Sequence, residues 1–421
     1  MRHTLRYLGI LGAGASLLLV LFGANPPVSQ ADSPTAPILL VVNDAGPSKF
    51  GRYLGEILRA EGLNNLDVTD ISGLTAAALA QHDLTILAQT SLTSDQAITL
   101  TNYVSGGGRL LAMRPDAQIK GVFGLGTASG VLNDGYLKIN DSASFNGVAP
   151  SQGLVTATLQ IHGGTDQYSV LPGAVVIAQL YSDATNATAY PSVIGSNYGT
   201  GQAAAFTYDL AQNVIYTRQG NPANANIDVD GDGITRTIDL FQTIGGGAPW
   251  VDRDRIPIPQ ADEQQRLFAR LVQQLVSNVR PLPQLWYFPD TAKTMLILTG
   301  DAHANPTSYY QNEINSLNSH GGKITFYLSI ASDPTDASVQ TWHAQGNEFG
   351  IHPYAYKQDS NPSFNITSLA QGYDVYTSWF SSTFSSPQSR TVRNHQVVWQ
   401  GWTDAADIAV AHSIALDTNF Y

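Results

Sequence analysis

Short apolar runs alternate with segments of helical periodicity along most of this chain, and this alternation limits the folds open to it. In the first half, helical spacing of apolar residues at Lys49–Ala60 and Ser94–Val104 separates runs of strand length. These runs are Ile38–Val42, Leu66–Ile71, Leu84–Ala88 and Arg109–Met113. The alternation is typical of an α/β fold with a doubly wound parallel sheet. Between Leu154 and Tyr208 short runs broken by Gly and Asn predict a β-rich, antiparallel extension of that sheet.

The first 31 residues have the pattern of a secretory signal peptide. Arg2 and Arg6 stand before an apolar run from Leu8 to Ala24, and a small-x-small sequence ends at Ala31. We expect cleavage after Ala31 and a mature protein that is secreted or held in the cell envelope. The alternative is an uncleaved N-terminal anchor, because roughly 17 apolar residues is close to the lower limit for a membrane span. After cleavage, we expect no membrane-spanning segment.

Charge and cysteine content exclude several function classes. The chain has 33 acidic and 21 basic residues, for a formal net charge of −12. Nucleic-acid binding proteins concentrate basic residues, so we expect no nucleic-acid partner. The sequence contains no cysteine, which removes disulfides, thiolate metal ligands and a cysteine nucleophile.

Residues 36–250 form the first predicted domain. Asn43-Asp44-Ala45-Gly46-Pro47 follows its first strand, but no Gly-x-Gly-x-x-Gly motif is present, so a dinucleotide ligand is not expected. The order of elements resembles that of flavodoxin-like, glutamine-amidotransferase-like domains. Those amidotransferases attack with a cysteine, which this chain lacks, so we interpret the region as a non-catalytic accessory domain.

An acidic loop near the end of this domain has the spacing of a calcium site. The segment Asp228–Gly233 reads Asp-x-Asp-x-Asp-Gly, and oxygen atoms at such alternate positions suit calcium. The candidate ligands are Asp228, Asp230, Asp232, the carbonyl of Ile234 and Asp239. The alternative is a solvated acidic turn whose glycines only set the backbone.

A linker and a helix occupy residues 251–290, with the helix expected at Gln260–Ser277. Beyond residue 290, strand and helix again alternate, as in a β/α barrel. The expected strands are Thr294–Thr299, Lys323–Leu328, Glu348–Ile351, Thr391–Val392 and Ile414–Leu416. The expected helices are Thr307–Ser319, Ala337–Gln345, Ile366–Phe380 and Thr403–His412. A complete barrel needs more units, so residues 291–421 predict an incomplete barrel that ends early.

Polar side chains gather where these strands end. In β/α barrels the carboxyl ends of the strands carry the active site. The residues at these ends are Asp301, His303, His352, His395 and Asp417. Neutral imidazoles together with a carboxylate form a ligand set for a divalent metal ion with open positions. We therefore take Asp301, His303, His352 and His395 as candidate metal ligands.

Two motifs in this half resemble those of the polysaccharide deacetylases, the NodB homology domain. Leu298-Thr299-Gly300-Asp301-Ala302-His303 resembles the first motif, and Gly346–Pro353 resembles the second, which leads into a metal-binding histidine. Arg393 is the counterpart of the third-motif arginine. The resemblance covers roughly residues 291–421 and implies that Asp301 is the general base and that His352 binds metal.

The chain departs from this family at two ligand positions. Ala302 stands where the family has a metal-binding aspartate, and Tyr356 stands where it has a second histidine. We expect His303 and His395 to take over these positions, which leaves Asp301 as either ligand or base. Asp301, Arg393 and His395 are the candidate catalytic residues.

The resemblance implies a secreted hydrolase that removes N-acetyl groups from a glycan or a small N-acetylated substrate. The implied cofactor is a divalent transition metal, zinc before cobalt, nickel or manganese. The alternative is a barrel that has lost catalysis and binds a glycan or a protein at the cell surface.

Overall fold

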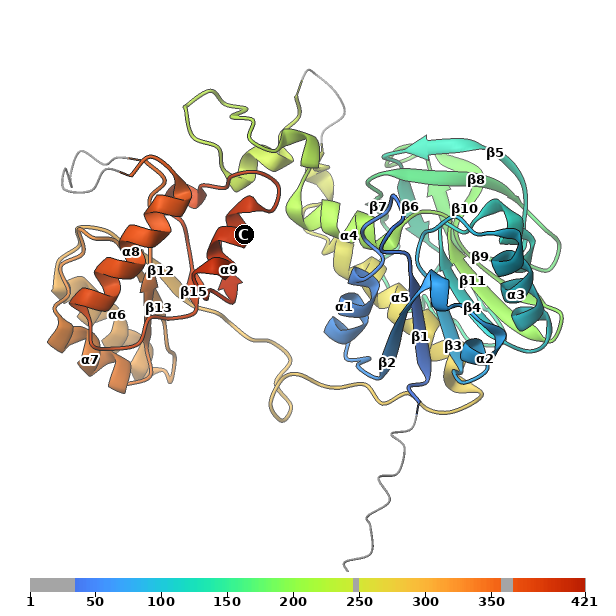
Figure 1. The fold of residues 1–421 in the computed structure, drawn as a ribbon, viewed down its shortest axis with the longest axis horizontal. Coiled ribbons are helices and arrows are strands. Elements are labelled where there is room, and N and C mark those ends of the chain that lie inside the picture. Colours follow the sequence, from blue (N-terminus) through green and yellow to red (C-terminus); the bar gives the residue numbers. More distant parts are fainter. Residues whose placement is uncertain (1–34, 245–249, 357–365, 421) are drawn as a thin grey trace, which may run out of the picture.

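The computed structural model describes residues 35–244, 250–356 and 366–420. The predicted signal peptide lies outside these residues. Among the helices of the described residues, none combines the length and apolar character that a membrane crossing requires. The chain has a mixed α/β fold with one large sheet and one small parallel sheet (Figure 1).

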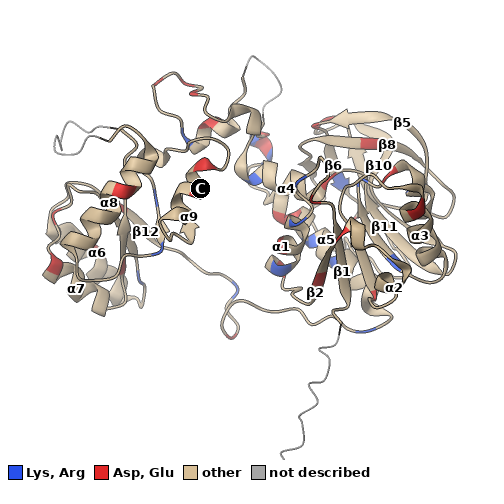
Figure 2. Cartoon of the chain, in the orientation of Figure 1, with Lys and Arg blue, Asp and Glu red and all other residues tan. Residues whose placement is uncertain are grey.

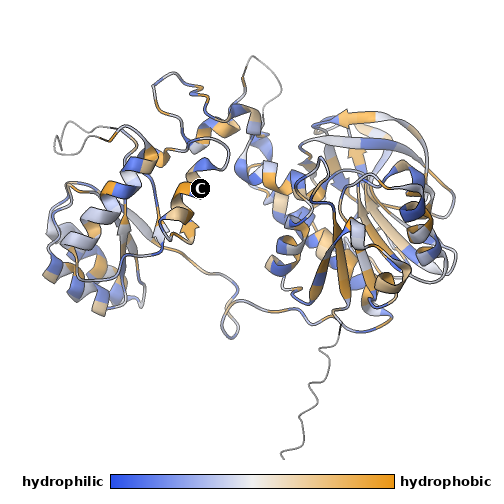
Figure 3. Cartoon of the chain, viewed as in Figure 1, coloured by the Kyte–Doolittle hydropathy of each residue, from blue (hydrophilic) through white to orange (hydrophobic). Residues whose placement is uncertain are grey.

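The large sheet has nine strands and belongs to the N-terminal part of the chain. Its strand order is β2-β1-β3-β4-β11-β10-β9-β6-β7. The parallel strands at one end are β2 (Leu66–Asp70), β1 (Ile38–Val42), β3 (Leu84–Leu87) and β4 (Arg109–Met113). These strands agree with the sequence prediction to within one residue. β1, β3 and β4 are almost entirely buried, with both faces covered, and they are among the most hydrophobic segments of the chain (Figure 3), whereas the edge strand β2 is partly exposed.

The predicted antiparallel extension is present, although it begins earlier in the chain than expected. β11 (Gly201–Phe206) pairs parallel with β4 and antiparallel with β10 (Ala187–Tyr198). The remaining strands of the sheet are β9 (Val175–Tyr181), β6 (Tyr136–Ile139) and β7 (Thr158–Gln160). A separate antiparallel pair is formed by β5 (Leu125–Asn133) and β8 (Gly164–Val170).

Helices cover both faces of the parallel strands. Along β1, Leu40 packs in one core and Leu39 in the other, as the alternation of side chains along a strand requires. One core is built with α1 (Tyr53–Ala60), α4 (Leu210–Gln219) and α5 (Gln260–Ser277). The other is built with α2 (Ala76–Leu79), α3 (Ser94–Ser105) and the 3-10 helix η2 (Ala117–Phe123). The short 3-10 helices elsewhere are η1 (Ile71–Gly73), η3 (Pro222–Asn224), η4 (Thr237–Phe241), η5 (Arg253–Arg255) and η6 (His395–Val397).

Two predicted helices of this part differ from expectation in extent or setting. α1 begins at Tyr53 rather than Lys49, because the residues before it form a turn in which the Tyr53 N–H donates to the Phe50 carbonyl at 3.0 Å. α5 has the predicted bounds, and it packs into the N-terminal part of the chain. Its residues Phe268 and Leu271 are fully buried in the core of the large sheet.

The C-terminal part contains a three-stranded parallel sheet followed by a short parallel pair. The sheet has the order β12 (Thr299–Ala302), β13 (Thr325–Leu328) and β14 (Glu348–Ile351), and the pair is β15 (Thr391–Val392) with β16 (Leu416–Asp417). β15 follows β14 in space, since the Ser389 N–H donates to the Phe349 carbonyl at 2.7 Å. The helices are α6 (Thr307–Ser319), α7 (Asp336–Ala344), α8 (Leu369–Thr383) and α9 (Asp404–Ala411).

The prediction of a buried strand at Thr294–Thr299 was wrong. β12 starts only at Thr299, where pairing with Thr325 of β13 sets its register. The apolar residues before it lie outside the sheet, and Leu296 is 82% exposed. An apolar run becomes a strand only where a neighbouring strand satisfies its backbone, and β13 pairs with the residues that follow this run.

The segment at the end of the first predicted domain packs on the C-terminal part. Leu240 of η4 is buried in the second core, and the rings of Phe241 and Phe420 are 6.4 Å apart. The backbone N–H of Trp399 donates to the Thr235 carbonyl at 3.1 Å. Residues 222–244 are therefore in contact with the elements that carry the predicted metal ligands.

Candidate metal centre

Three of the four predicted metal ligands come together at the carboxyl ends of parallel strands. His303 follows β12, His352 follows β14 and His395 follows β15. Because parallel strands end at the same edge of a sheet, residues that are distant in sequence become neighbours there. At least one ring nitrogen of each histidine lies within 4.8 Å of those of the other two.

The geometry of these nitrogens fits a divalent metal ion. His303 Nε2 lies 3.1 Å from His395 Nδ1, and that atom lies 3.2 Å from His352 Nε2. Nitrogen ligands at the usual zinc distance in a tetrahedral site stand about 3.3 Å apart. A ring nitrogen carries either one proton or one lone pair, so His395 Nδ1 cannot form a well-aligned hydrogen bond to both of the other rings. A shared cation removes that conflict, and the side chains present therefore fit such an ion.

His352 is the most constrained member of this His303–His352–His395 cluster. Its side chain is buried, and its Nδ1 lies 2.8 Å from the backbone carbonyl of Arg393. Since a carbonyl only accepts, Nδ1 carries the proton and Nε2 keeps its lone pair toward the other two rings. Burial, together with His395 and His303, lowers the pKa of His352 to about 3. The ring is therefore neutral at physiological pH, which is the form that binds metals.

His395 is oriented by an aromatic neighbour that the sequence did not suggest. The rings of Tyr354 and His395 stack with centroids 3.7 Å apart and an interplanar angle of 16°. Burial, followed by the proximity of His303, lowers the pKa of His395 to about 4. Tyr354 lies two residues after His352, but stacking on His395 depends on the fold and leaves no signal in the sequence.

Asp301 lies beside the cluster and pairs with Arg393. Its carboxylate is 3.4 Å from Arg393 Nη1, and it does not belong to the group of converging ligand atoms. About a third of the Asp301 side chain is exposed. Burial raises the pKa of this carboxyl, while Arg393 and His303 oppose the rise. A carboxylate with a raised pKa suits proton transfer, so this placement favours the role of base over that of ligand.

Arg393 is anchored by two further contacts. Its Nη2 donates to Thr299 Oγ1 at 2.9 Å and its Nε donates to the Thr418 carbonyl at 3.1 Å. The arginine therefore links the start of β12 to the end of β16. Asp417 is the last of the strand-end residues. Its side chain accepts a hydrogen bond from the Asn419 backbone N–H at 3.1 Å and so stabilises the turn after β16.

The two positions that depart from the deacetylase pattern have other structural roles. Ala302 is buried in the core, and the Tyr356 hydroxyl donates to Gln396 Oε1 at 2.8 Å. Neither supplies a metal ligand. His303 and His395 do join His352 in the cluster, and their role as replacements for the family's ligands stays a prediction.

The acidic loop brings together three of its five predicted calcium ligands. Carboxylate oxygens of Asp228, Asp230 and Asp232 lie within 4.8 Å of one another. Arg236 Nη2 contacts Asp232 at 2.6 Å, and its Nη1 donates to the Ile234 carbonyl at 3.4 Å. Asp239 is buried and accepts the backbone N–H groups of Val229 and Arg236. Because Arg236 also pairs with this loop, the closeness of the three carboxylates does not test calcium binding, and the calcium site stays a prediction.

Comparison with known proteins identifies no family for this chain. No family model matches it, and no curated protein matches it. Among solved structures, a β-galactosidase from Rahnella sp. is 17% identical, with a TM-score of 0.32 over 41% of this chain and 28% of that chain. A β-galactosidase from Bacillus circulans is 12% identical, with a TM-score of 0.33 over 43% of this chain and 30% of that chain. A ThuA-like protein from Bacteroides uniformis is 14% identical, with a TM-score of 0.33 over 44% of this chain and 86% of that chain.

These likenesses are too remote to support a functional argument. The match spans less than a third of each of the two β-galactosidases. The α/β class follows from the sheets themselves, and the resemblance to polysaccharide deacetylases stays a prediction that no comparison tests.

Proposed function

We propose that this chain is a secreted, metal-dependent hydrolase that removes N-acetyl groups from a glycan. The observation that carries the proposal is the convergence of three ring nitrogens, from His303, His352 and His395, at separations of 3.1 and 3.2 Å. In finer terms, we assign the N-terminal part to the doubly wound, amidotransferase-like type and the C-terminal part to an incomplete deacetylase-type barrel. The proposed place of action is outside the cell or in its envelope.

The three histidines would hold the ion, with zinc first and cobalt, nickel or manganese as alternatives. Bound in an open three-nitrogen set, such an ion polarises a carbonyl group and activates water. The hydrogen bond from His352 Nδ1 to the Arg393 carbonyl fixes the tautomer that leaves Nε2 available. Stacking on Tyr354 holds the His395 ring at its angle.

Asp301 moves the proton in this proposal. It accepts a proton from the attacking water as the water oxygen bonds to the amide carbon, and it returns that proton to the amine nitrogen as the carbon–nitrogen bond breaks. The products are acetate and a free amine. The raised pKa of Asp301 supports both steps, because the group must be able to carry the proton between them.

Arg393 positions Asp301 rather than reacting itself. Its contacts to Thr299 and Thr418 fix the guanidinium, and the guanidinium in turn holds the carboxylate beside the cluster. Arg393 also favours the ionised form of Asp301, which is the form that accepts a proton.

Release of acetate from N-acetylated chitin oligosaccharides by the full chain tests this function. The wild-type chain, loaded with zinc, is expected to release acetate, and His352→Ala is expected to release none above background. His320→Ala is the matched control, because His320 lies at the end of α6 and bonds only to its own helix. A wild-type chain that binds metal but releases no acetate would favour the alternative, a glycan- or protein-binding module.

A further inference from the structure

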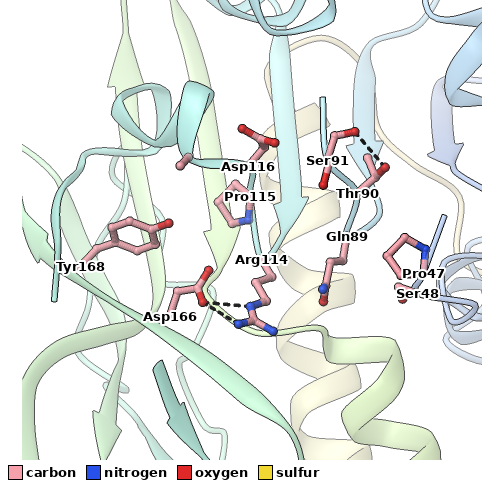
Figure 4. Close-up of a pocket in the computed structure, with 11 residues that line it drawn as sticks. Pro47, Ser48, Gln89, Thr90, Ser91, Arg114, Pro115, Asp116, Asp166 and Tyr168 are labelled. Atoms are coloured by element: carbon pink, nitrogen blue, oxygen red, sulfur yellow. Dashed lines mark hydrogen bonds and ion pairs between the residues drawn. The ribbon is translucent and has the colours of Figure 1, made fainter. Parts of the chain in front are cut away.

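A cavity of about 220 Å³ opens at the carboxyl ends of β1, β3 and β4, in the N-terminal part of the chain (Figure 4). The chain leaves β1 toward β2 on one side and later returns to β3 on the other, so the strand order reverses between β1 and β3. Open α/β sheets bind their ligands in the crevice at this point. The two loops are tied together there, since Asn43 Nδ2 donates to Thr90 Oγ1 at 2.9 Å.

The charged groups of this cavity are already engaged with protein partners. Arg114 donates to one oxygen of Asp166 through Nε at 3.0 Å and Nη2 at 2.8 Å. Asp116 accepts the backbone N–H groups of Leu92 and Gln118. Among the lining residues the cavity therefore combines two carboxylates with one arginine that is itself paired.

The rest of the lining consists of neutral hydrogen-bonding groups and small apolar faces. The neutral polar members are Ser48, Gln89, Thr90, Ser91 and Tyr168, and the apolar members are Pro47, Pro115 and Ala117. Hydroxyl and amide groups both donate and accept. A matching ligand must therefore be small and must carry groups that donate and accept hydrogen bonds on several of its sides.

Two structural features indicate that the cavity is a ligand-binding site. Arg114 is held with φ of +40°, a left-handed conformation that residues other than glycine rarely adopt. Such conformations persist where the surrounding structure enforces them, and they concentrate at binding and active sites. Gln89 Oε1 is buried and has no hydrogen-bond partner among the described residues. Figure 4 shows the Gln89 amide between the Arg114 guanidinium and Ser48.

Ser48 is held in place by a buried carboxylate behind it. Its Oγ donates to Asp209 Oδ2 at 3.0 Å, and Asp209 also caps α4 by accepting the N–H groups of Ala211 and Gln212. The Ser48 oxygen therefore keeps its lone pairs for a donor in the cavity. This contact joins the loop after β1 to the start of α4.

We propose that this cavity binds one neutral sugar ring. The volume is below the roughly 300–1,000 Å³ of sites for drug-sized ligands, which suits a single ring. Ring hydroxyls can donate to Asp166 and to the Ser48 oxygen, accept from Arg114 N–H groups and pair with the Gln89 amide. An anionic sugar would face Asp116 and Asp166, and the arginine that lines the cavity is already paired with Asp166. The site is separate from the histidine cluster and does not depend on the deacetylase proposal.

Saturation-transfer NMR on the purified full chain tests the proposal with a fixed panel. The panel contains the neutral sugars glucose, galactose, mannose and N-acetylglucosamine, with glucuronate as the charged counterpart of glucose. At least one neutral sugar is expected to bind, and glucuronate is expected to bind at least about tenfold more weakly than glucose or not at all. If no neutral sugar binds, or if glucuronate binds more tightly than all four, the proposal is overturned.

Variants place the binding in this cavity. Gln89→Ala and Ser48→Ala are each expected to weaken the neutral sugar about tenfold, while His320→Ala, at the end of α6, is expected to leave its affinity unchanged. Two variants are used so that the result does not rest on one that folds poorly, and circular dichroism checks both. Sugar affinity that survives both Gln89→Ala and Ser48→Ala would contradict the assignment.

Discussion

The Nδ1 atom of His352 donates to the backbone carbonyl of Arg393 over 2.8 Å, and this bond joins the first residue after β14 to the first residue after β15. It leaves His352 Nε2 unprotonated and directed at the rings of His303 and His395. Burial keeps the His352 ring neutral, with a pKa of about 3. This arrangement is the physical basis for placing a metal ion here.

Asp301→Asn should abolish most of the activity and leave metal binding intact. An amide cannot accept the proton of water, and removal of a general base typically costs about 10²–10⁴-fold in rate. Acetate release and bound metal are measured on the same sample. Loss of the metal with the activity would instead make Asp301 a ligand.

Arg393→Met should raise the pH below which the rate of acetate release falls. Arg393 opposes the rise in the Asp301 pKa that burial causes, so its removal raises that pKa further. The base must be ionised to act, and a higher pKa means that activity is lost earlier as the pH falls. The rate at saturating substrate is measured from pH 5 to 8; an unchanged acid limb would show that Asp301 is not the titrating group.

Tyr354→Leu should weaken metal binding about tenfold, whereas Tyr354→Phe should keep most of it. The phenylalanine ring can still stack on His395, and the leucine side chain cannot. Affinity is measured by competition with a metal-binding dye at a temperature where both variants are folded. Equal affinities of the two variants would show that stacking does not position the His395 ring.

His162→Phe should make the chain more resistant to acid. His162 is 6% exposed and stacks on Trp250, and burial lowers its pKa to about 4. The unfolded chain takes up a proton near pH 6.5 and the folded chain does not, so stability is complete above pH 6.5 and falls as the pH drops toward 4. The slope is at most about 1.4 kcal/mol per pH unit for this one group.

Urea unfolding at pH 7.5 and pH 5.5 measures this effect. The loss of unfolding free energy between the two pH values should be smaller in the variant by roughly 1 kcal/mol. An equal loss in both proteins would mean that His162 is protonated in the folded chain.

Calcium should raise the melting temperature if the acidic loop binds it. Asp228, Asp230 and Asp232 lie close together, and a cation would offset their mutual repulsion. The increase should disappear in Asp230→Asn and persist in Asp254→Asn, an exposed aspartate of η5. No change with calcium in the wild-type chain would mean that Arg236, rather than a cation, balances the loop.

Much of the fold was predictable because local periodicity determines it. The bounds of α5 and α6 agree with the apolar spacing, and the parallel strands β1, β2, β3 and β4 agree with the predicted runs to within one residue. The histidine cluster was predictable for a topological reason, since residues after parallel strands share one edge of the sheet.

The rest depends on contacts between distant residues. The run before Thr299 is as apolar as a buried strand, yet only pairing with β13 decides where β12 begins. Arg114 and Asp166 are 52 positions apart, and nothing in either segment indicates that they meet. His162 has no recognisable pattern around it, yet it is buried against Trp250. Such placements follow from tertiary packing, which a single sequence does not encode locally.

Figure 2 shows lysine and arginine scattered over several elements rather than gathered along one, and the chain has a formal net charge of −12. Positive charge at the histidine cluster comes from Arg393, which is paired with Asp301. Exclusion of a polyanionic partner therefore stays a prediction from charge.

Metal content is the most direct test of the central claim. The full chain, purified and dialysed against a mixture of zinc, cobalt, nickel and manganese, is analysed by inductively coupled plasma mass spectrometry beside His352→Ala and His320→Ala. The account predicts about one transition-metal ion per chain in the wild type and in His320→Ala, and close to none in His352→Ala. A wild-type chain without bound metal, or equal metal in all three proteins, would contradict it.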